Sequence, residues 1–263
     1  MVSTKQIEQE KREVNNEINE TEQEKRWTLF DERGFRTFVE PGEVVEVRIL
    51  GARGRDSAWD GYWANGTVSG YFDGYQEFCE SVELADKAKN NGIYFTLQVI
   101  DPRLIGRVRN RLRPADQTTS DNNVIAYRWL PIDIDPIRPS GISSSNTELS
   151  AALELREEVE EWVVSNMDFP KPVKAMSGNG AHLLFRLPDI PVNESSTTFM
   201  KNTLLGLADR FSNNSVDVDT SVFNPARIWK LYGTTARKGD PVPGSQHQEE
   251  RPHRLAYIDN LGD

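Results

Sequence analysis

Apolar and polar residues alternate in several short stretches of the chain, and this period of two predicts β-strands. Strands are expected over 43–50, 93–100 and 124–134. Residues 61–72 alternate on both sides of an Asn-Gly pair, so they predict a hairpin that turns at this pair. A second hairpin is expected where "KPVKAM" and "AHLLFRL" flank "SGNG", and a last strand through "ARIWKLY".

Helical spacing predicts helices between these strands. They are expected over 75–90, over 197–212 and from Ser145, which forms a capping box with Glu148, to about residue 165. The run "RLIGRVRNRLR", residues 103–113, fits an amphipathic helix with aliphatic residues on one face and arginines on the rest. This mixture of strands and helices predicts an α+β or α/β fold with a mixed sheet.

The beginning of the chain differs from the rest in composition. Residues 3–26 are almost wholly polar, and their few aliphatic residues form no face wide enough to pack firmly against a core. We therefore expect residues 1–26 to be a polar extension, helical or mobile, and residues 27–263 to form one compact domain.

The net charge of −10 and the pI near 5.0 disfavour a protein that binds nucleic acid through its overall charge. Positive charge is nevertheless concentrated in 103–113 and 227–238, and such strips can bind a phosphate backbone. No apolar run is long enough to span a bilayer and the N-terminus lacks an apolar signal region, so we expect a cytoplasmic protein without membrane contact. The single cysteine, Cys79, excludes an internal disulfide and a cysteine-based zinc site.

The stretch "WLPIDIDP", residues 129–136, is the first candidate for chemistry. In a strand, Asp133 and Asp135 project from the same face, opposite the apolar Ile132 and Ile134. Two carboxylates at this spacing repel each other unless a divalent cation such as Mg²⁺ or Mn²⁺ lies between them. The alternative is that both are solvated turn residues before Pro136.

The turn "SGNG", residues 177–180, is the second candidate. Its glycines permit positive backbone torsions and leave amide groups free, a geometry that can bind an anion. Ser177, the turn amides and His182 could together contact a nucleoside triphosphate. An ordinary β-turn followed by a surface histidine explains the same residues.

The third candidate is "VDVDTSVFNPARIWKLYGTTARKGD", residues 216–240. It offers a further carboxylate at Asp219 and cations at Arg227 and Lys230. These two cations are three residues apart, so they share a face only if the strand bulges or ends between them. A strand with charged edges is the alternative interpretation.

Together the three stretches resemble the archaeo-eukaryotic primase superfamily, the primase–polymerases. The family has a strand-borne Asp-x-Asp, an S-G-x-G-x-H turn, and a later acid followed by an Arg-x-x-Lys-like stretch; here these are "DID" at 133–135, "SGNGAH" at 177–182, and Asp219 with Arg227 and Lys230. The flanking text "RWLPIDIDPIRPSGISSS", "NPARIWKLYGTTARKGD" and "RPHR" is similar to primase–polymerases of phages, plasmids and other mobile elements, and some relatives are CRISPR-associated. The resemblance covers about residues 70–256 and implies an RRM-like catalytic sheet with an adjoining α/β unit.

The resemblance implies a DNA-dependent primase–polymerase that makes, and in some relatives extends, primers on single-stranded DNA from nucleoside triphosphates. Two divalent cations, and no zinc, would be held by Asp133, Asp135 and Asp219; Asp217 is a rival, but Asp219 directly precedes "TSVFNPAR", where the family places its acid. The nucleotide would be bound by Ser177, Gly178, Asn179, His182, Arg227 and Lys230. Further candidates for template or nucleotide contacts are Arg107, Arg111, Arg138, Ser143, Arg237, Lys238 and His253.

Two other functions remain open from the sequence. A metal-dependent nuclease could use the same acids and histidine to activate water. A non-catalytic module that binds single strands would depend on aromatic stacking, for which Tyr127, Trp129 and Trp229 are available. The triphosphate-binding pattern favours the polymerase, which would work with a helicase domain or with separate replication proteins.

Overall fold

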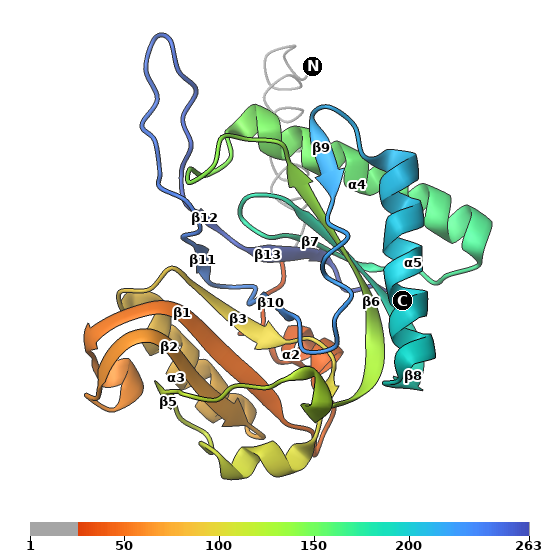
Figure 1. Cartoon of the computed structure of the whole chain (residues 1–263). Coiled ribbons are helices and arrows are strands. Elements are labelled where there is room, and N and C mark those ends of the chain that lie inside the picture. The colour runs from red at the N-terminus through yellow and green to blue at the C-terminus, as the bar shows by residue number, and fades with distance from the viewer. Residues whose placement is uncertain (1–25, 263) are drawn as a thin grey trace, which may run out of the picture.

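A computed structural model describes residues 26–262, which form two antiparallel β-sheets with helices around them (Figure 1). The α+β class predicted from the sequence is confirmed. The predicted polar extension falls on residues 1–26, of which residues 1–25 lie outside the described part, so the domain boundary stays a prediction. Within 26–262, no helix is both long enough and apolar enough to cross a membrane.

The first sheet has five strands and one open, largely polar face. In sheet order its strands are β10 (Ile228–Lys230), β3 (Gly92–Thr96), β1 (Val45–Arg55), β2 (Trp63–Phe72) and β5 (Arg113–Pro114). Helix α3 (Tyr75–Lys87) packs on the other face, where Phe78, Val82 and Ala85 are buried. Burial of these apolar side chains fixes which side of the sheet remains open.

The second sheet carries the "DID" stretch. Its strands in order are β13 (Tyr257–Asn260), β7 (Val173–Met176), β8 (Ala181–Pro191), β6 (Val124–Pro136) and β4 (Val99–Ile100), with β9 (Val216–Val218) also paired to β6. Helices α4 (Asn146–Met167) and α5 (Glu194–Phe211) pack against it, as Figure 1 shows. The Ser145–Glu148 capping box predicted for α4 is present.

The remaining elements are short. They are helix α2 (Glu32–Phe38), the 3₁₀ turns η1 (Ser57–Trp59), η2 (Pro102–Gly106) and η3 (Asp121–Asn123), and the strand pair β11 (Thr235–Ala236) and β12 (Arg254–Leu255).

The two sheets are joined at Leu97 and Gln98, where the chain leaves β3 and enters β4. The buried Gln98 amide donates to the carbonyl of Trp129 at 2.8 Å and accepts from the backbone amides of Arg128 and Trp129. The buried Arg128 guanidinium in turn binds Glu43, which precedes β1, and Asp189 in β8. The predicted single strand over 93–100 is therefore two strands in two sheets.

Two predicted elements were wrong. Residues 61–72 do not form a hairpin: Asn65 and Gly66 lie inside β2, which pairs with β1 along its length, and the chain turns at η1 instead. Residues 103–113 do not form an amphipathic helix. Their backbone instead pairs with β2, since the amide of Tyr71 donates to Val108 and the amide of Asn110 donates to Tyr71. Backbone groups of 103–113 therefore form hydrogen bonds with the edge of β2, whereas in a helix they would have bonded to one another.

Candidate active site

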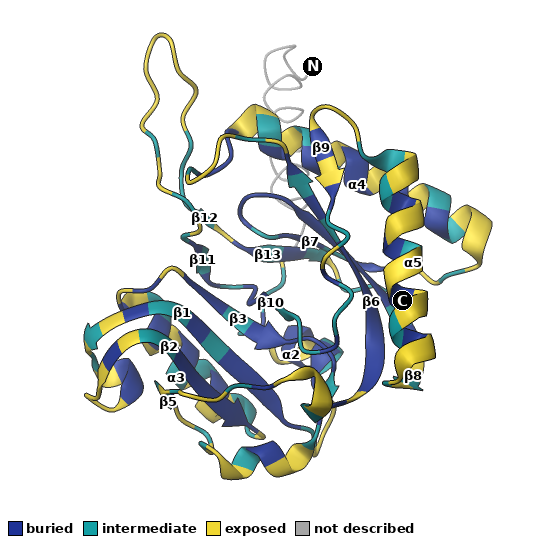
Figure 2. Ribbon diagram, viewed as in Figure 1, coloured by how far each residue is buried: buried dark blue, intermediate teal, exposed yellow. Residues whose placement is uncertain are grey.

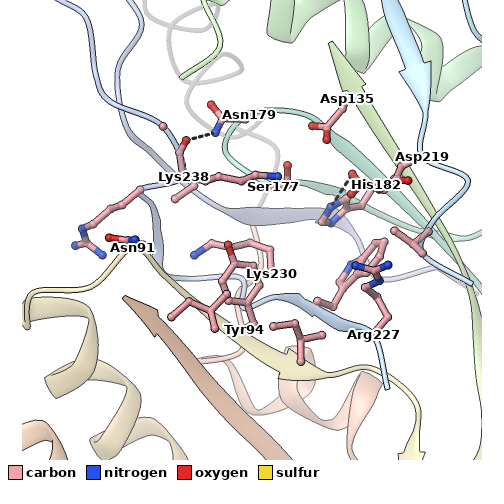
Figure 3. Close-up of a pocket in the computed structure, with 18 of the residues that line it drawn as sticks. Asn91, Tyr94, Asp135, Ser177, Asn179, His182, Asp219, Arg227, Lys230 and Lys238 are labelled. Atoms are coloured by element: carbon pink, nitrogen blue, oxygen red, sulfur yellow. Dashed lines mark hydrogen bonds and ion pairs between the residues drawn. The ribbon is translucent and has the colours of Figure 1, made fainter. Parts of the chain in front are cut away.

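A cavity of about 500 Å³ lies between the two sheets and brings together residues from all three candidate stretches. The predicted site residues that line it are Asp133, Asp135, Arg138, Ser177, Asn179, His182, Asp219, Arg227, Lys230, Arg237 and Lys238. In Figure 3, Asp135, Asp219 and His182 come from the second sheet, and Lys230 and Tyr94 face them from the first. Carboxylates and basic side chains therefore line the walls of the same cavity.

Asp133 and Asp135 point into the cavity because β6 alternates. Ile132 and Ile134 are fully buried on the core face, so the carboxylates take the other face. Asp133 is opposite His182 in the β6–β8 ladder, and its carboxylate lies 3.3 Å from Nε2 of His182. The amide of Asp219 donates to the carbonyl of Asp133 at 2.8 Å, which holds the third aspartate beside the first. Asp217, the rival of Asp219, is exposed and does not line the cavity.

The two strand carboxylates have opposite pKa shifts. Burial, reinforced by the negative charge of Asp133, raises the pKa of Asp135 to about 6, and the guanidinium of Arg138 at 3.5 Å only partly opposes this rise. Burial alone would raise the pKa of Asp133 as well. The charge and hydrogen bond of His182, with Lys238 and Arg227, outweigh burial and hold the pKa of Asp133 below its ordinary value. A second carboxylate charge here is therefore unfavourable without a cation.

The "SGNG" turn connects β7 and β8 as predicted, but the amides of both glycines are engaged. The amide of Gly180 donates to the Ser177 hydroxyl at 3.0 Å, and the amide of Gly178 contacts the sulfur of Met176. These two amides are therefore not bare, contrary to the prediction. Gly178 has φ of +106° and approaches β11 so closely that a Cβ would lie 2.2 Å from the Cβ of Ala236, which explains the need for glycine. Gly178 itself does not line the cavity.

Asn179 fixes the turn to its neighbours. Its side-chain oxygen accepts from the amide of Ser144 at 2.8 Å, and its side-chain nitrogen donates to the carbonyl of Lys238 at 3.0 Å. The dashed line in Figure 3 marks the second of these contacts. Asn179 therefore holds the Lys238 segment against the cavity as well as lining it.

His182 is held by a chain of buried hydrogen bonds. Its Nδ1 lies 2.7 Å from the hydroxyl of Tyr232, and that hydroxyl lies 2.8 Å from Nε1 of Trp229. An indole nitrogen can only donate, so the Tyr232 oxygen accepts from Trp229. The Tyr232 hydroxyl has no other hydrogen-bond acceptor among the described residues, so when His182 is neutral its hydrogen is directed to Nδ1. This leaves the hydrogen of neutral His182 on Nε2, which faces Asp133.

Lys230 is an unusual cation because it is buried without a carboxylate in contact. Its Nζ donates to the Thr234 hydroxyl at 2.7 Å and to the carbonyl of Thr235 at 3.1 Å. Burial lowers the pKa of Lys230 to about 7, and the nearby Arg237 adds to this effect while Asp86 opposes it. The amine is thus poised to gain a proton when an anion enters the cavity.

Arg227 lies just before β10 begins, which lets it share the cavity with Lys230 despite their spacing of three. Its guanidinium donates to the carbonyl of Ser221 at 2.5 Å. Arg237 is paired with Asp86 at 2.7 Å, so part of its charge is already compensated. The cationic wall therefore combines free and paired side chains.

The other predicted contacts do not line the cavity. Arg107 donates to the hydroxyl of Tyr71 and the carbonyl of Thr118, and Arg111 is exposed. Because 103–113 is not a helix, these two arginines do not share a helical face, and their contact with a template stays a prediction. Ser143 is fully buried, and His253 contacts the carbonyl of Gly239 at 2.8 Å. None of the four lines the cavity.

Sequence reasoning missed several residues that form or support the cavity. Leu50, Asn91 and Tyr94, which lie in or next to the first sheet, line it, and Tyr232 forms a hydrogen bond with His182. Tyr94 lies in an apolar strand with no local sign of function, and Tyr232 is 50 positions from its partner. Only its position directly after the "RIWK" cations could have drawn attention to Tyr232.

Comparison with solved structures gave a structural likeness, whereas the sequence comparisons gave none. No protein-family model matches the sequence, and no curated protein matches it. The polymerase domain of Mycobacterium tuberculosis ligase D, solved in complex with DNA, is similar with a TM-score of 0.42 and 13% sequence identity. The match covers 79% of this chain and 75% of that one, and at this identity it concerns the fold alone.

Proposed function

We propose that this protein is a template-directed nucleotidyltransferase of the primase–polymerase type, which joins nucleotides from nucleoside triphosphates on single-stranded DNA. One observation carries the proposal. Asp133, Asp135 and Asp219 line the same cavity as Arg227 and Lys230. A nucleoside triphosphate with its divalent cations needs both kinds of wall, because carboxylates hold the cations and basic side chains bind the phosphate tail.

The residues present fit a pair of Mg²⁺ or Mn²⁺ ions in their donor chemistry. Carboxylate oxygens are the ligands such hard ions prefer. Burial and the charge of Asp133 raise the pKa of Asp135 to about 6, and a divalent cation would relieve the repulsion between the two carboxylates. Asp133, Asp135 and Asp219 would hold the ions, which when bound activate the 3′-hydroxyl and neutralise the triphosphate.

The carboxylates do not form a closed site as they stand. Within residues 26–262, no three acidic, histidine or cysteine side chains converge closely enough to enclose a metal ion. Asp219 instead accepts a hydrogen bond from the amide of Ser221 at 2.7 Å. Loading of the ions would therefore include reorientation of the Asp219 side chain, which is partly exposed and free to turn.

The chain's own groups would bind and orient the nucleotide. Nε2–H of His182 and the hydroxyl of Ser177 donate toward the phosphates, and Arg227 supplies a fixed positive charge. With a pKa of about 7, Lys230 is about half protonated at pH 7 and would become more fully protonated as the phosphates enter, because a nearby anion favours the charged form. Positioning and charge neutralisation of this kind account for most of the catalysis of phosphoryl transfer.

A nuclease would use the same carboxylates but has no triphosphate to bind. The cationic wall of Arg227, Lys230 and Lys238 therefore favours transfer over hydrolysis. A module that only binds single strands would gain nothing from two adjacent half-buried carboxylates, which cost stability unless a cation compensates them. A helicase domain or separate replication proteins remain the expected partners.

The test is incubation of the full chain with unprimed single-stranded DNA, labelled nucleotides and Mg²⁺ or Mn²⁺. We expect labelled oligonucleotides from the wild type and none from Asp133→Ala, which should keep the folded circular dichroism spectrum. If even a primed template yields no product, the proposal is wrong. Shortening of the DNA would then indicate the nuclease.

A further inference from the structure

Strand β1 contains a β-bulge directly beside the cavity. Ile49 is opposite Val68 and Ala52 is opposite Gly66, so β1 has one residue more than β2 between these pairs. Gly51, in the bulge, has φ of +65°. A Cβ there would lie 2.4 Å from the side chain of Asn91, which lines the cavity, so both the torsion and the space require glycine.

The bulge decides which side of the sheet two arginines occupy. With unbroken alternation, Arg53 and Arg55 would share the core face of Ile49. The extra residue reverses the alternation, so Ala52 is buried and both arginines project from the open face. Leu50, which lines the cavity, lies on that same face. The bulge therefore places a basic surface next to the cavity, on the same face of the sheet.

We name this surface the β1–β2 strip and define it by Arg53, Arg55, Trp63, Asn65 and Lys89. Arg53 is opposite Asn65 and Arg55 is opposite Trp63 in the ladder, so each arginine stands beside a side chain suited to contact a base. Trp63 is 67% exposed. The amide of Arg53 contacts the carbonyl of Lys89, which brings the lysine to the edge of the strip. Figure 2 shows exposed residues at this end of β1 and β2.

The positive charge of the strip is uncompensated, although the whole chain carries −10. The nearby acids are already engaged: Asp56 caps η1, Asp60 pairs with Arg113, and Asp86 pairs with Arg237. Within the described residues, Arg53, Arg55 and Lys89 form no ion pair. These three cations therefore attract an anionic partner.

We propose that the β1–β2 strip binds the single-stranded template next to the cavity, with phosphates on Arg53, Arg55 and Lys89 and a base stacked on Trp63. This inference rests on the proposed function and identifies where its DNA partner lies. Cations alternating with an exposed indole match a strand of phosphates and bases better than an acidic peptide, which offers no ring to stack.

The test compares two double variants of the full chain that change the net charge equally. The strip variant, Arg53→Gln with Arg55→Gln, removes two of the three cations of the strip. The α5 variant, Lys201→Gln with Arg210→Gln, removes two exposed cations of α5. Binding of fluorescent single-stranded DNA is followed by anisotropy at several salt concentrations, without nucleotide. We expect roughly tenfold weaker binding for the strip variant and a slope of log K against log salt smaller by about 1.4, since each single-strand phosphate contact contributes about 0.7. The α5 variant should stay within about twofold of the wild type.

Trp63 provides an independent test. Trp63→Ala should weaken binding roughly 5- to 100-fold with an unchanged salt slope, because stacking is not ionic. Trp63→Phe should restore most of the affinity. Equal behaviour of the strip and α5 variants, or no binding by the wild type even at low salt, would overturn the proposal.

The proposed role of the strip and the proposed polymerase activity can be contradicted separately. If the wild type makes product and the strip variant binds and extends DNA normally, the strip is wrong and the proposed function stands. If single strands bind through Arg53 and Arg55 but no nucleotide is incorporated, the proposed function is wrong and the strip stands.

Discussion

The hydroxyl of Tyr232 lies 2.7 Å from Nδ1 of His182 in the floor of the cavity. Tyr232 is fully buried, and desolvation keeps its pKa well above the ordinary value, so it remains a neutral donor at any physiological pH. Because Trp229 donates to the Tyr232 oxygen and His182 is the other partner of that hydroxyl, the tyrosine hydrogen is directed at Nδ1 when His182 is neutral. The contact therefore sets which nitrogen of His182 faces the carboxylates with a hydrogen.

Tyr232→Phe should weaken nucleotide binding about fivefold, since the loss of one neutral hydrogen bond costs about 1 kcal/mol. The nucleotide KM should rise more than kcat falls. Nitrogen NMR is a direct readout because the chain has three histidines, and the Nδ1 resonance of His182 should shift toward the protonated form while His247 and His253 stay unchanged. An unchanged Nδ1 resonance would contradict the assigned hydrogen positions.

Asp219→Asn should reduce nucleotide incorporation by roughly 100-fold or more, because it removes a charged ligand from the proposed metal site. Asp217→Asn is the matched control two residues away: Asp217 is exposed, pairs through its backbone with Asp135, and does not line the cavity. Its activity should stay within about twofold of the wild type. Comparable losses in both variants, measured by primer extension, would remove the distinction between the two aspartates.

Lys230→Met should abolish one component of the pH dependence of stability. The folded pKa of Lys230 is about 7 and its ordinary value is 10.5, so between these values the unfolded chain holds a proton that the folded chain lacks. Stability from this group therefore rises by up to about 1.4 kcal/mol per pH unit as pH increases from 7. Urea unfolding at pH 7 and pH 9 should show this rise in the wild type and in Lys201→Met, which changes an exposed lysine, but not in Lys230→Met.

Two glycines should respond oppositely to alanine. Gly180 lies so close to β6 that a Cβ would meet the carbonyl of Ile134 at 2.4 Å and the carboxylate of Asp135 at 2.9 Å, so Gly180→Ala should cost about 1–3 kcal/mol. Gly206 lies inside α5 with nothing within 4 Å, so Gly206→Ala should stabilise the protein by about 0.5–1 kcal/mol. Thermal unfolding measures both. A Gly180→Ala protein as stable as the wild type would show that this turn has room to move.

The sequence predicted the parts of the site that lie on one strand or one turn. Strict alternation in β6 placed Asp133 and Asp135 on one face, and the "SGNG" turn placed His182 on the next strand. It could not predict the contact of His182 with Tyr232, because no local pattern reports on residues 50 positions apart.

The errors have the same physical origin. The spacing of apolar residues in 103–113 suits a helix, yet the backbone of this segment forms hydrogen bonds with the open edge of β2. A single extra residue at Gly51 reversed the sides of Arg53 and Arg55, and a pattern of period two does not reveal such a bulge. Pairing with distant strands therefore determined the conformation of these segments, whereas local periodicity was enough to predict the conformation of β6.

The link at Gln98 limits how the cleft can work. Rotation of one sheet against the other would break the hydrogen bonds of Gln98 and separate the Arg128 guanidinium from Glu43 or Asp189, all on partly or fully buried atoms. Hinge closure over the substrate is therefore disfavoured in this molecule. Induced fit would be confined to side chains, because the segment of Arg237 and Lys238 is itself held by Asp86 and Asn179. Discrimination between substrates would then depend on the fixed shape of the walls rather than on a closing motion.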